Sequence, residues 1–346
     1  MNTALETASA PALSPTTAID SQHFDPVEAA NAEPQDVAHE QDAHETISNG
    51  ERLVTLAFVV VPFLGVIFAI ASLWGIGVSW YHLVTLVVMY FVTALGISVG
   101  YHRLFSHRAF KTPAFMRAYF AITGAMAAEG SVRRFVANHR RHHSHSDREG
   151  DPHSPHHEDG EGVWHVVKGF WYAHMGWFLQ GRPHPDEAKY APEFSKKSGK
   201  KLDRAVTFVD TTNWFWVIVG LAIPTAVCGV IGQSWSSAFL GLLWGGIVRI
   251  FVVHHVTFSV NSVCHLWGTR PFRSGDHSRN NWFFGWFGVG EGWHNNHHAF
   301  PYSARHGLRW WEFDVGYVLV KALEKVGLAS DVRVPAAARL EKAKNR

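Results

Sequence analysis

Residues 53–74 read LVTLAFVVVPFLGVIFAIASLW, a run of 22 residues without a charged side chain. At a rise of 1.5 Å per residue, an α-helix of this length crosses the hydrocarbon core of a bilayer, which is about 30 Å thick. Residues 80–100 form a second run of 21 residues that contains no Asp, Glu, Lys or Arg. The two runs predict two transmembrane helices joined by the short turn at 75–79.

Two further apolar runs lie in the second half of the chain. Residues 214–232 form the third run, and residues 236–260 form the fourth. The fourth is interrupted by Arg249, His254 and His255, which are costly inside lipid unless other groups satisfy them. We therefore predict an all-α integral membrane protein with four transmembrane helices.

The remaining segments are too polar or too short to cross a membrane. Residues 1–50 contain nine acidic residues and no Lys or Arg, which predicts a disordered tail. They also lack the basic, apolar and cleavage regions of a signal peptide, so the first apolar run is expected to stay in the mature protein. Residues 115–130 are apolar but short and include Arg117, which favours an interfacial or re-entrant helix.

The basic residues predict the orientation in the membrane. Of the 31 Lys and Arg residues, 17 lie in residues 101–212 and 12 in residues 261–346, whereas the turns at 75–79 and 233–235 contain none. By the positive-inside rule, both termini face the cytoplasm, and the membrane is the cytoplasmic one if the source is bacterial. The predicted parts are an acidic tail at 1–50, a membrane domain at 51–320 with a cytoplasmic helical cap at 101–212 and 261–320, and a C-terminal tail at 321–346.

The composition excludes several classes of protein. A net charge of +2 gives no reason to expect a nucleic-acid partner. Two cysteines, Cys228 and Cys264, cannot form an iron–sulfur cluster site or a zinc ribbon within the chain. The mean hydropathy of −0.04 averages polar and membrane-length segments. The unusual feature is the 24 histidines, about one residue in 14, which points to metal binding.

Three histidine clusters follow or precede the apolar runs. Residues 102–107 read HRLFSH, residues 139–143 read HRRHH, and residues 294–298 read HNNHH. In the last two clusters the first histidine has partners three and four residues later, so one helical face presents several imidazoles together. Because one tetrahedral zinc would leave half of these eight histidines unused, the clusters predict two metal ions. Zn, Cu, Fe and Ni all accept imidazole ligands.

Other histidines and motifs carry less weight. His145, His153, His156 and His157 lie among acidic residues and prolines, which is typical of a solvated loop. Glu291 and His294 form a single ExxH pair, whereas soluble di-iron bundles use two such pairs with further glutamates. There is no HExxH motif, which argues against a zinc protease.

The clusters and their flanking residues resemble the integral-membrane fatty acid desaturases, in particular the acyl-CoA Δ9 branch related to stearoyl-CoA desaturase. The resemblance covers roughly residues 53–320 and includes the order of the clusters relative to the four apolar runs. The matching segments are HRLFSH at 102–107, HRRHHSHSD at 139–147, NSVCHLWG at 261–268 and EGWHNNHH at 291–298.

The resemblance implies a di-iron centre with nine histidine ligands and a water held by Asn261. It adds His265, which follows the fourth apolar run, to the eight histidines of the clusters. The implied division places His102, His107, His139, His143 and His297 on one iron and His142, His265, His294 and His298 on the other.

The same resemblance implies the reaction. Two electrons reduce the irons to Fe²⁺, O2 is the co-substrate, and a fatty acyl chain receives a cis double bond. No protein acid or base is required, since the metals carry the redox chemistry. The chain contains no haem-attachment motif, ferredoxin cysteines or dinucleotide fingerprint. Electrons are therefore expected from a separate protein of the ferredoxin, rubredoxin, cytochrome or flavin-reductase type.

A methylene group has no polar handle, so the position of the double bond requires a narrow apolar tunnel that places the chain. Trp177, Phe258 and Trp282 are candidates for its wall, although tryptophans near a bilayer are more often interfacial anchors.

The sequence indicates the reaction more clearly than it indicates the molecule that carries the acyl chain. Animal acyl-CoA enzymes of this family have an Arg-Asp pair and an Arg-Lys pair that contact CoA, and here these pairs are replaced by Ala137-Asn138 and Gln180-Gly181. Nearby cations could substitute for them, so acyl-CoA is the expected substrate and an acyl chain on a phospholipid is the alternative. These cations are Arg133, Arg134, Arg182 and Lys189.

Two other functions use similar residues. Membrane alkane or lipid hydroxylases share the histidine clusters and the oxygen chemistry, and would form an alcohol in place of an alkene. A metal transporter or store would bind ions in transit, but its sites belong near the middle of the membrane, where only His254, His255 and Arg249 lie.

Overall fold

The computed structural model describes residues 48–345 apart from residues 76, 157–159, 181–184 and 200. The described residues form helices joined by loops and a few isolated β-bridges, as the all-α prediction requires. Most of the predicted acidic tail lies outside the described residues, which begin at Ser48.

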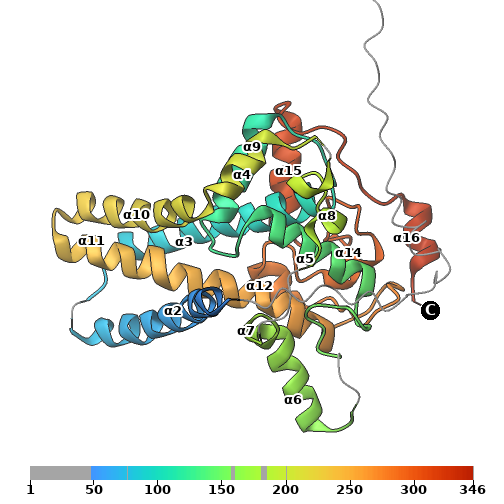
Figure 1. Cartoon of the computed structure of the whole chain (residues 1–346), viewed down its shortest axis with the longest axis horizontal. Coiled ribbons are helices and arrows are strands. Elements are labelled where there is room, and N and C mark those ends of the chain that lie inside the picture. The colour runs from blue at the N-terminus through green and yellow to red at the C-terminus, as the bar shows by residue number, and fades with distance from the viewer. Residues whose placement is uncertain (1–47, 76, 157–159, 181–184, 200, 346) are drawn as a thin grey trace, which may run out of the picture. The chain divides into compact units, whose positions relative to one another are not determined.

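Four helical segments are long and apolar enough to cross a membrane, which confirms the predicted number (Figure 1). The second comprises α3 and a π-helical continuation, and the fourth comprises α11, a second π-helical stretch and α12. Their bounds are α2 (Asn49–Gly75), α3 (Trp80–Leu95) with Gly96–Ser106, α10 (Asn213–Gly232), and α11 (Trp235–Gly241) with Leu242–Val248 and α12 (Arg249–Leu266).

The second and fourth segments continue beyond their predicted ends at residues 100 and 260. They contain 27 and 32 residues, which corresponds to about 40 and 48 Å of helix. Both lengths exceed the hydrocarbon core of about 30 Å, so one end of each helix projects beyond it. These projecting ends carry His102 and His265 into the cap.

The polar residues inside the fourth segment are satisfied by protein groups. The guanidinium of Arg249 is completely buried and donates to the backbone carbonyls of Met126, Gly220 and Gly245. His254 Nε2 lies 2.9 Å from the carbonyl oxygen of Ala127. Such partners remove the cost of placing these groups at membrane depth, which explains why the helix is uninterrupted.

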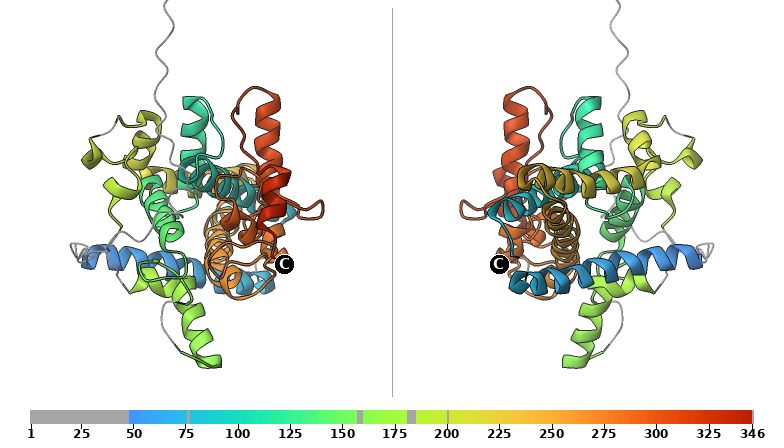
Figure 2. Two further views of the ribbon diagram at one scale, coloured as in Figure 1. Left: turned by 90° about the vertical axis from the view of Figure 1, so that its right-hand side faces the viewer. Right: turned by 90° about the vertical axis from the view of Figure 1, so that its left-hand side faces the viewer.

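The cap consists of shorter helices at one end of the four long ones. Figures 1 and 2 show α4 and α15 projecting on one side of the long helices and α6 on the other. The segment predicted as an interfacial or re-entrant helix forms α4, whose 12 residues are too few to cross a bilayer. The cap helices are α4 (Ala114–Ala125), α5 (Val132–His145), α6 (Val163–Trp171), α7 (Trp177–Leu179), α8 (Glu187–Tyr190), α9 (Arg204–Thr211), α13 (Trp282–Phe287), α14 (His294–Ala299), α15 (Val315–Lys325) and α16 (Ala337–Ala343), with a π-helical turn at Tyr172–Gly176 and a 3₁₀ turn at Lys196–Ser198.

The C-terminal segment belongs to the cap. Helix α15 crosses the boundary predicted at residue 320, and Val320 and Leu323 are part of the main apolar core. Ser330 pairs with Lys111, and the backbone nitrogen of Asn345 donates to the carbonyl oxygen of Pro271. The boundary at 320 therefore does not separate two parts of the structure, because the residues after it supply core contacts.

Candidate metal centre

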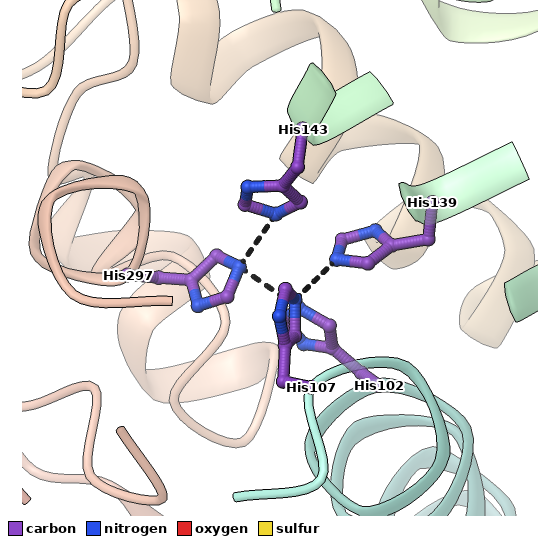
Figure 3. A group of neighbouring side chains, drawn as sticks. All are labelled: His102, His107, His139, His143 and His297. Carbon is purple, nitrogen blue, oxygen red and sulfur yellow. Dashed lines mark hydrogen bonds between the residues drawn. The ribbon is translucent and has the colours of Figure 1, made fainter. Parts of the chain in front are cut away.

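Five histidines from three elements converge in the cap (Figure 3). Each offers one ring nitrogen, and these nitrogens all lie within 4.8 Å of one another. The π-helical end of the second long segment contributes one histidine, and the residue that follows this segment contributes another. Helix α5 contributes two histidines, and helix α14 contributes one. The five-histidine group comprises His102, His107, His139, His143 and His297.

A second group of four histidines lies beside the first. Its ring nitrogens also lie within 4.8 Å of one another, and all four side chains are buried. The rings of His143 and His298, one from each group, stack with their centroids 4.4 Å apart. The four-histidine group comprises His142, His265, His294 and His298. The two groups contain the same residues as the predicted division.

The HxxHH spacing explains how α5 serves both groups. His139 and His143 are four residues apart and share one face of α5, whereas His142 points to the four-histidine group. Helix α14 has the mirrored arrangement, with His297 in the five-histidine group and His294 and His298 in the other. Each HxxHH motif therefore supplies ligand nitrogens to two neighbouring positions.

Distances between the Nε2 atoms of the five-histidine group are close to, and partly shorter than, those of ligands around one ion. The Nε2 atoms of His107 and His139 are 2.7 Å apart. The Nε2 atom of His297 lies 2.9 Å from that of His143 and 3.0 Å from that of His102. Nitrogen ligands placed about 2.1 Å from one metal ion are about 3.0–3.4 Å from each other. The spacing thus leaves room for one ion at the centre of the group.

Carboxylates fix the orientation of the rings in the four-histidine group. The Nδ1 atom of His142 lies 3.0 Å from both carboxylate oxygens of Asp151. The Nδ1 atom of His298 lies 2.5 Å from a carboxylate oxygen of Asp276. Because each carboxylate accepts the Nδ1 proton, a neutral ring presents the lone pair on Nε2. The two Nε2 atoms are 3.4 Å apart, so their lone pairs face each other in a position where a metal ion between them would be favourable.

Asp147 supplies the third carboxylate that orients a ring of this group, the ring of His265. The Nδ1 atom of His265 lies 2.8 Å from Asp147, and its Nε2 atom lies 3.1 Å from Nε2 of His294. In the five-histidine group, Glu291 lies 2.5 Å from Nδ1 of His102. This pattern of imidazole ligands oriented by outer carboxylates is typical of metal centres.

The pKa values of five of the nine histidines favour neutral rings. Burial, followed by the neighbouring imidazoles, holds the pKa of five histidines well below the usual range. Neutral imidazoles retain the lone pair that a metal requires. These are His107, His139, His143, His294 and His297.

The outer carboxyl groups show the opposite balance. Burial alone would raise their pKa values, but the charges and hydrogen bonds of the neighbouring groups, above all histidines, together outweigh burial and hold the pKa below the usual range. They therefore stay ionised and accept hydrogen bonds from the rings. The four groups are Asp147, Asp151, Asp276 and Glu291.

The loop after α5 is not the solvated segment that the sequence suggests. Asp151 and His153 are buried, and the His153 ring lies 4.4 Å from that of His142. His156 is half-buried, and its Nε2 atom lies 3.1 Å from the carbonyl oxygen of His265. The interpretation was wrong for the buried part of this loop, because Asp147 and Asp151 face histidines of the four-histidine group, whereas Glu149 is exposed. His157 lies outside the described residues.

A pocket between α3 and α12 reaches the histidines. Its walls are mainly apolar side chains of the two helices, together with Phe135 from α5 and the loop after α13. Asn261 lines it beside His142 and His294. The full lining is Tyr90, Ala94, Ile97, Ser98, His102, Phe135, His139, His142, Val253, Val256, Thr257, Val260, Asn261, Gly288, Val289, Glu291 and His294.

The three aromatic residues predicted for a tunnel wall lie outside this pocket. Trp177 packs against His153, with ring centroids 5.3 Å apart. Phe258 packs against Phe178 and His174. Trp282 on α13 is 67% exposed. Aromatic content near the clusters does not identify the wall, because the wall consists mainly of aliphatic residues on α3 and α12.

Comparison with known proteins agrees with this geometry. The family model described as "Fatty acid desaturase" matches residues 78–328, which include both histidine groups and their carboxylates. The chain belongs to the fatty acid desaturase family. Members of this family are oxidoreductases, and the four apolar helices are those of a membrane protein.

Three relatives illustrate the range of the family. The chain is 45% identical over 287 residues to the hex-5-enoyl-[acyl-carrier protein] acetylenase of Moorena producens, covering 83% of this chain and 87% of that protein. It is 36% identical over 258 residues to the sn-1 stearoyl-lipid 9-desaturase of Anabaena variabilis, with 74% and 85% covered. It is 38% identical over 255 residues to the chloroplastic palmitoyl-monogalactosyldiacylglycerol delta-7 desaturase of Arabidopsis thaliana, with 73% and 62% covered.

Proposed function

We propose that this desaturase-family protein is an O2-dependent fatty acyl desaturase that inserts a cis double bond, at the Δ9 position, into a saturated acyl chain. The observation that carries the proposal is the convergence of nine imidazoles, in two adjacent groups, at a narrow apolar pocket. The nine histidines would hold two irons, with five ligands for one and four for the other.

The ligand groups suit iron because they combine imidazole nitrogens with outer carboxylates that keep the rings correctly oriented. When bound, two irons would supply the redox chemistry. O2, two electrons from a separate protein, two protons and one hydrogen from each of two adjacent methylenes would yield a double bond and two waters. The protein itself supplies the ligands, the placement of the chain and the exclusion of bulk water.

Placement of the acyl chain would come from the pocket. Tyr90, Ala94 and Ile97 repeat at helical spacing along the second long segment toward His102 and form one wall. The 12 residues from Tyr90 to His102 correspond to about 18 Å of helix, so the pocket extends from the histidines toward membrane depth. The hydroxyl of Tyr90 donates to the carbonyl oxygen of Phe287 and closes one side. A methylene at a fixed distance along the chain would thus face the metals.

Asn261 is proposed to hold a water beside the irons. Its side chain lines the pocket next to His142 and His294. Because it would act on a water and not on a metal directly, Asn261→Ala should cost about 10–100-fold in activity or metal affinity. Loss as complete as that of a histidine variant would show that Asn261 has a different role.

The sequence resemblance implies acyl-CoA as the substrate. We favour an acyl chain that is carried on a membrane lipid. Arg133, one of the cations available to replace the missing CoA contacts, pairs with Glu187 at 2.7 Å and Asp210 at 3.8 Å. Arg134 lies 3.7 Å from Glu51. CoA phosphates would have to compete with these carboxylates. Gly181 and Arg182 lie outside the described residues.

Expression in a host that lacks unsaturated fatty acids, followed by mass spectrometry of its lipids, tests the proposal. We expect a cis-monounsaturated product, with the double bond located by fragmentation. A hydroxylated product would indicate a hydroxylase, and no change in the presence of a competent electron donor would contradict the proposal. Assays of the purified protein with stearoyl-CoA, stearoyl-acyl carrier protein and stearoyl-phospholipid then separate the carriers.

Both termini are proposed to face the cytoplasm, because the turns between the paired long helices lack Lys and Arg whereas the cap is rich in them. Cysteines introduced at Gly77 and Gln233 should react with an impermeant thiol reagent in intact cells. A cysteine at Lys325 in the cap should react only after permeabilisation. The reverse pattern would overturn this orientation.

A further inference from the structure

A large groove on the cap lies apart from the histidine pocket. It has a volume of about 490 Å³, within the range of ligand sites, and lies between the N-terminal ends of α4 and α9 and the end of the second long segment. We call it the α4–α9 groove. Its lining is Leu104, Phe105, Arg108, Ala114, Arg117, Glu193, Phe194, Lys201, Leu202, Asp203, Arg204 and Ala205.

The apolar part of the groove is combined with two cations that have no partner among the described residues. Leu104, Phe194 and Leu202 supply apolar surface. Lys201 and Arg204 are exposed and make no ion pair or side-chain hydrogen bond with any described residue. The groove therefore offers both hydrocarbon contacts and free positive charge.

The two carboxylates of the groove are already engaged. Glu193 accepts from Arg108 at 2.8 Å and from Arg140 at 2.7 Å. Burial opposes ionisation of Glu193, but these guanidiniums lower its pKa to about 2. Asp203 pairs with Arg117 at 2.5 Å and also accepts from the first backbone nitrogens of α9. Neither carboxylate is free to neutralise Lys201 or Arg204, so the groove favours an anion.

The groove lies near the depth of lipid headgroups. Leu104 is 24 residues after Trp80, about 36 Å along the helix, whereas the hydrocarbon core is about 30 Å thick. Phe115 on α4 and Phe208 on α9 are 61% and 62% exposed, and Trp214 at the start of α10 is 55% exposed. Exposed aromatic residues of this kind mark the membrane–water interface.

We propose that the α4–α9 groove binds an anionic phospholipid of the leaflet adjoining the cap, at a site separate from the proposed substrate pocket. The phosphate would lie between Lys201 and Arg204, and the glycerol and first methylenes against Leu202 and Phe194. The combination of apolar floor, free cations and interfacial depth favours a lipid over an acidic protein, which would need a wide flat surface.

The test uses the delipidated full-length protein in neutral detergent. It is titrated separately with dioleoyl-phosphatidylglycerol, dioleoyl-phosphatidylcholine and inorganic phosphate, and bound lipid is counted by native mass spectrometry. We expect saturable binding of one phosphatidylglycerol in preference to phosphatidylcholine, with no competition by phosphate at equal concentration. Equal binding of the two lipids would overturn the proposal, and so would full displacement by inorganic phosphate.

Two variants show whether the groove itself is the site. Each cation near an anionic lipid adds about 1 kcal/mol, or about fivefold, so Lys201→Ala with Arg204→Ala should weaken binding about 25-fold. The matched control, Lys325→Ala with Lys342→Ala, removes the same charge from α15 and α16 and should bind normally. Ala205→Phe fills the groove and keeps both cations, and it should also lose binding. Retained binding in Ala205→Phe, or equal loss in the control, would show general charge attraction only.

Discussion

The two histidine groups differ in how firmly the protein holds them. In the four-histidine group every ring is buried, and three of the four have a carboxylate on Nδ1. In the five-histidine group, His107, His139 and His143 are partly exposed. Only His102 has such a carboxylate among the described residues, and Nδ1 of His297 is buried without a partner.

This difference indicates two ways of building a metal site. Outer carboxylates preset the tautomer and direction of the rings before any metal binds, so the four-histidine group should be largely preorganised. The five-histidine group relies on the number of its ligands and on the metal itself to align them. We therefore expect the two groups to respond differently to substitution.

Removal of a ligand should have the largest effect. His265→Ala and His297→Ala each delete one ligand of a different group, and both should reduce desaturation to background while the helices remain inserted. Loss should be complete in both because the proposed reaction uses a metal in each group. Product analysis at matched membrane levels of protein gives the measurement.

His156→Ala serves as the control for these variants. Among the described residues its ring contacts the backbone carbonyl of His265 and the ring of His277, so activity should fall no more than a few-fold. Turnover of His265→Ala equal to that of His156→Ala would mean that His265 is not a ligand.

Replacement of an outer carboxylate should have an intermediate effect and should separate the groups. Asp276→Asn retains the shape of the side chain but no longer holds the Nδ1 proton of His298 as a carboxylate does. It should cost about 10–100-fold in metal affinity at the four-histidine group and leave the other group loaded. Asp331→Asn, at an exposed aspartate paired with Lys111, is the matched control. Equal metal loss from both groups in Asp276→Asn would contradict the claim that Asp276 supports the four-histidine group in particular.

A mild fall in pH should have the smallest effect on the active, iron-loaded protein and should act mainly on the stability of the metal-free protein. His107, His139, His143, His294 and His297 have lowered pKa values and stay neutral in the folded protein. Burial together with His142 lowers the pKa of His153 to about 3. Below the ordinary value of 6.5 the unfolded chain binds more protons than the folded one, so stability falls as the pH falls. Each such histidine costs about 1 kcal/mol per pH unit.

Thermal unfolding at pH 7.5, 6.5 and 5.5 measures this effect. We expect the midpoint of the metal-free protein to decrease below pH 6.5. The iron-loaded protein should change less over the same interval, because bound ligands cannot take up protons. A midpoint that rises on acidification of the metal-free protein would contradict the assignment of neutral, buried histidines.

The sequence allowed the long helices and the histidine clusters to be predicted for simple physical reasons. An uncharged run such as residues 53–74 has no stable alternative to a membrane helix or a buried one. An HxxHH motif on a helix places imidazoles on one side because of the helical period alone. The four-residue spacing was therefore enough to predict that His139 and His143 lie on the same face. The role of His265 came from resemblance, since a single histidine after an apolar helix has no such pattern.

The outer carboxylates could not be predicted, because their roles depend on tertiary contacts. Asp147 faces a histidine 118 residues away, and Asp276 faces one 22 residues away. A run of acids and histidines after α5 was the available signal, but solvated loops have the same composition. The continuation of helices to Ser106 and Leu266 was missed for a similar reason, since packing within the cap sustains these polar turns.

The metal content of active protein tests the central claim most directly. Protein reconstituted anaerobically with Fe²⁺ is freed of unbound metal, and iron per chain is measured by mass spectrometry together with desaturase turnover. The account predicts two irons per chain at full activity, and a decrease in tightly bound iron in His265→Ala with loss of turnover. Full activity with a single iron per chain would contradict the claim that both histidine groups hold a metal required for the reaction.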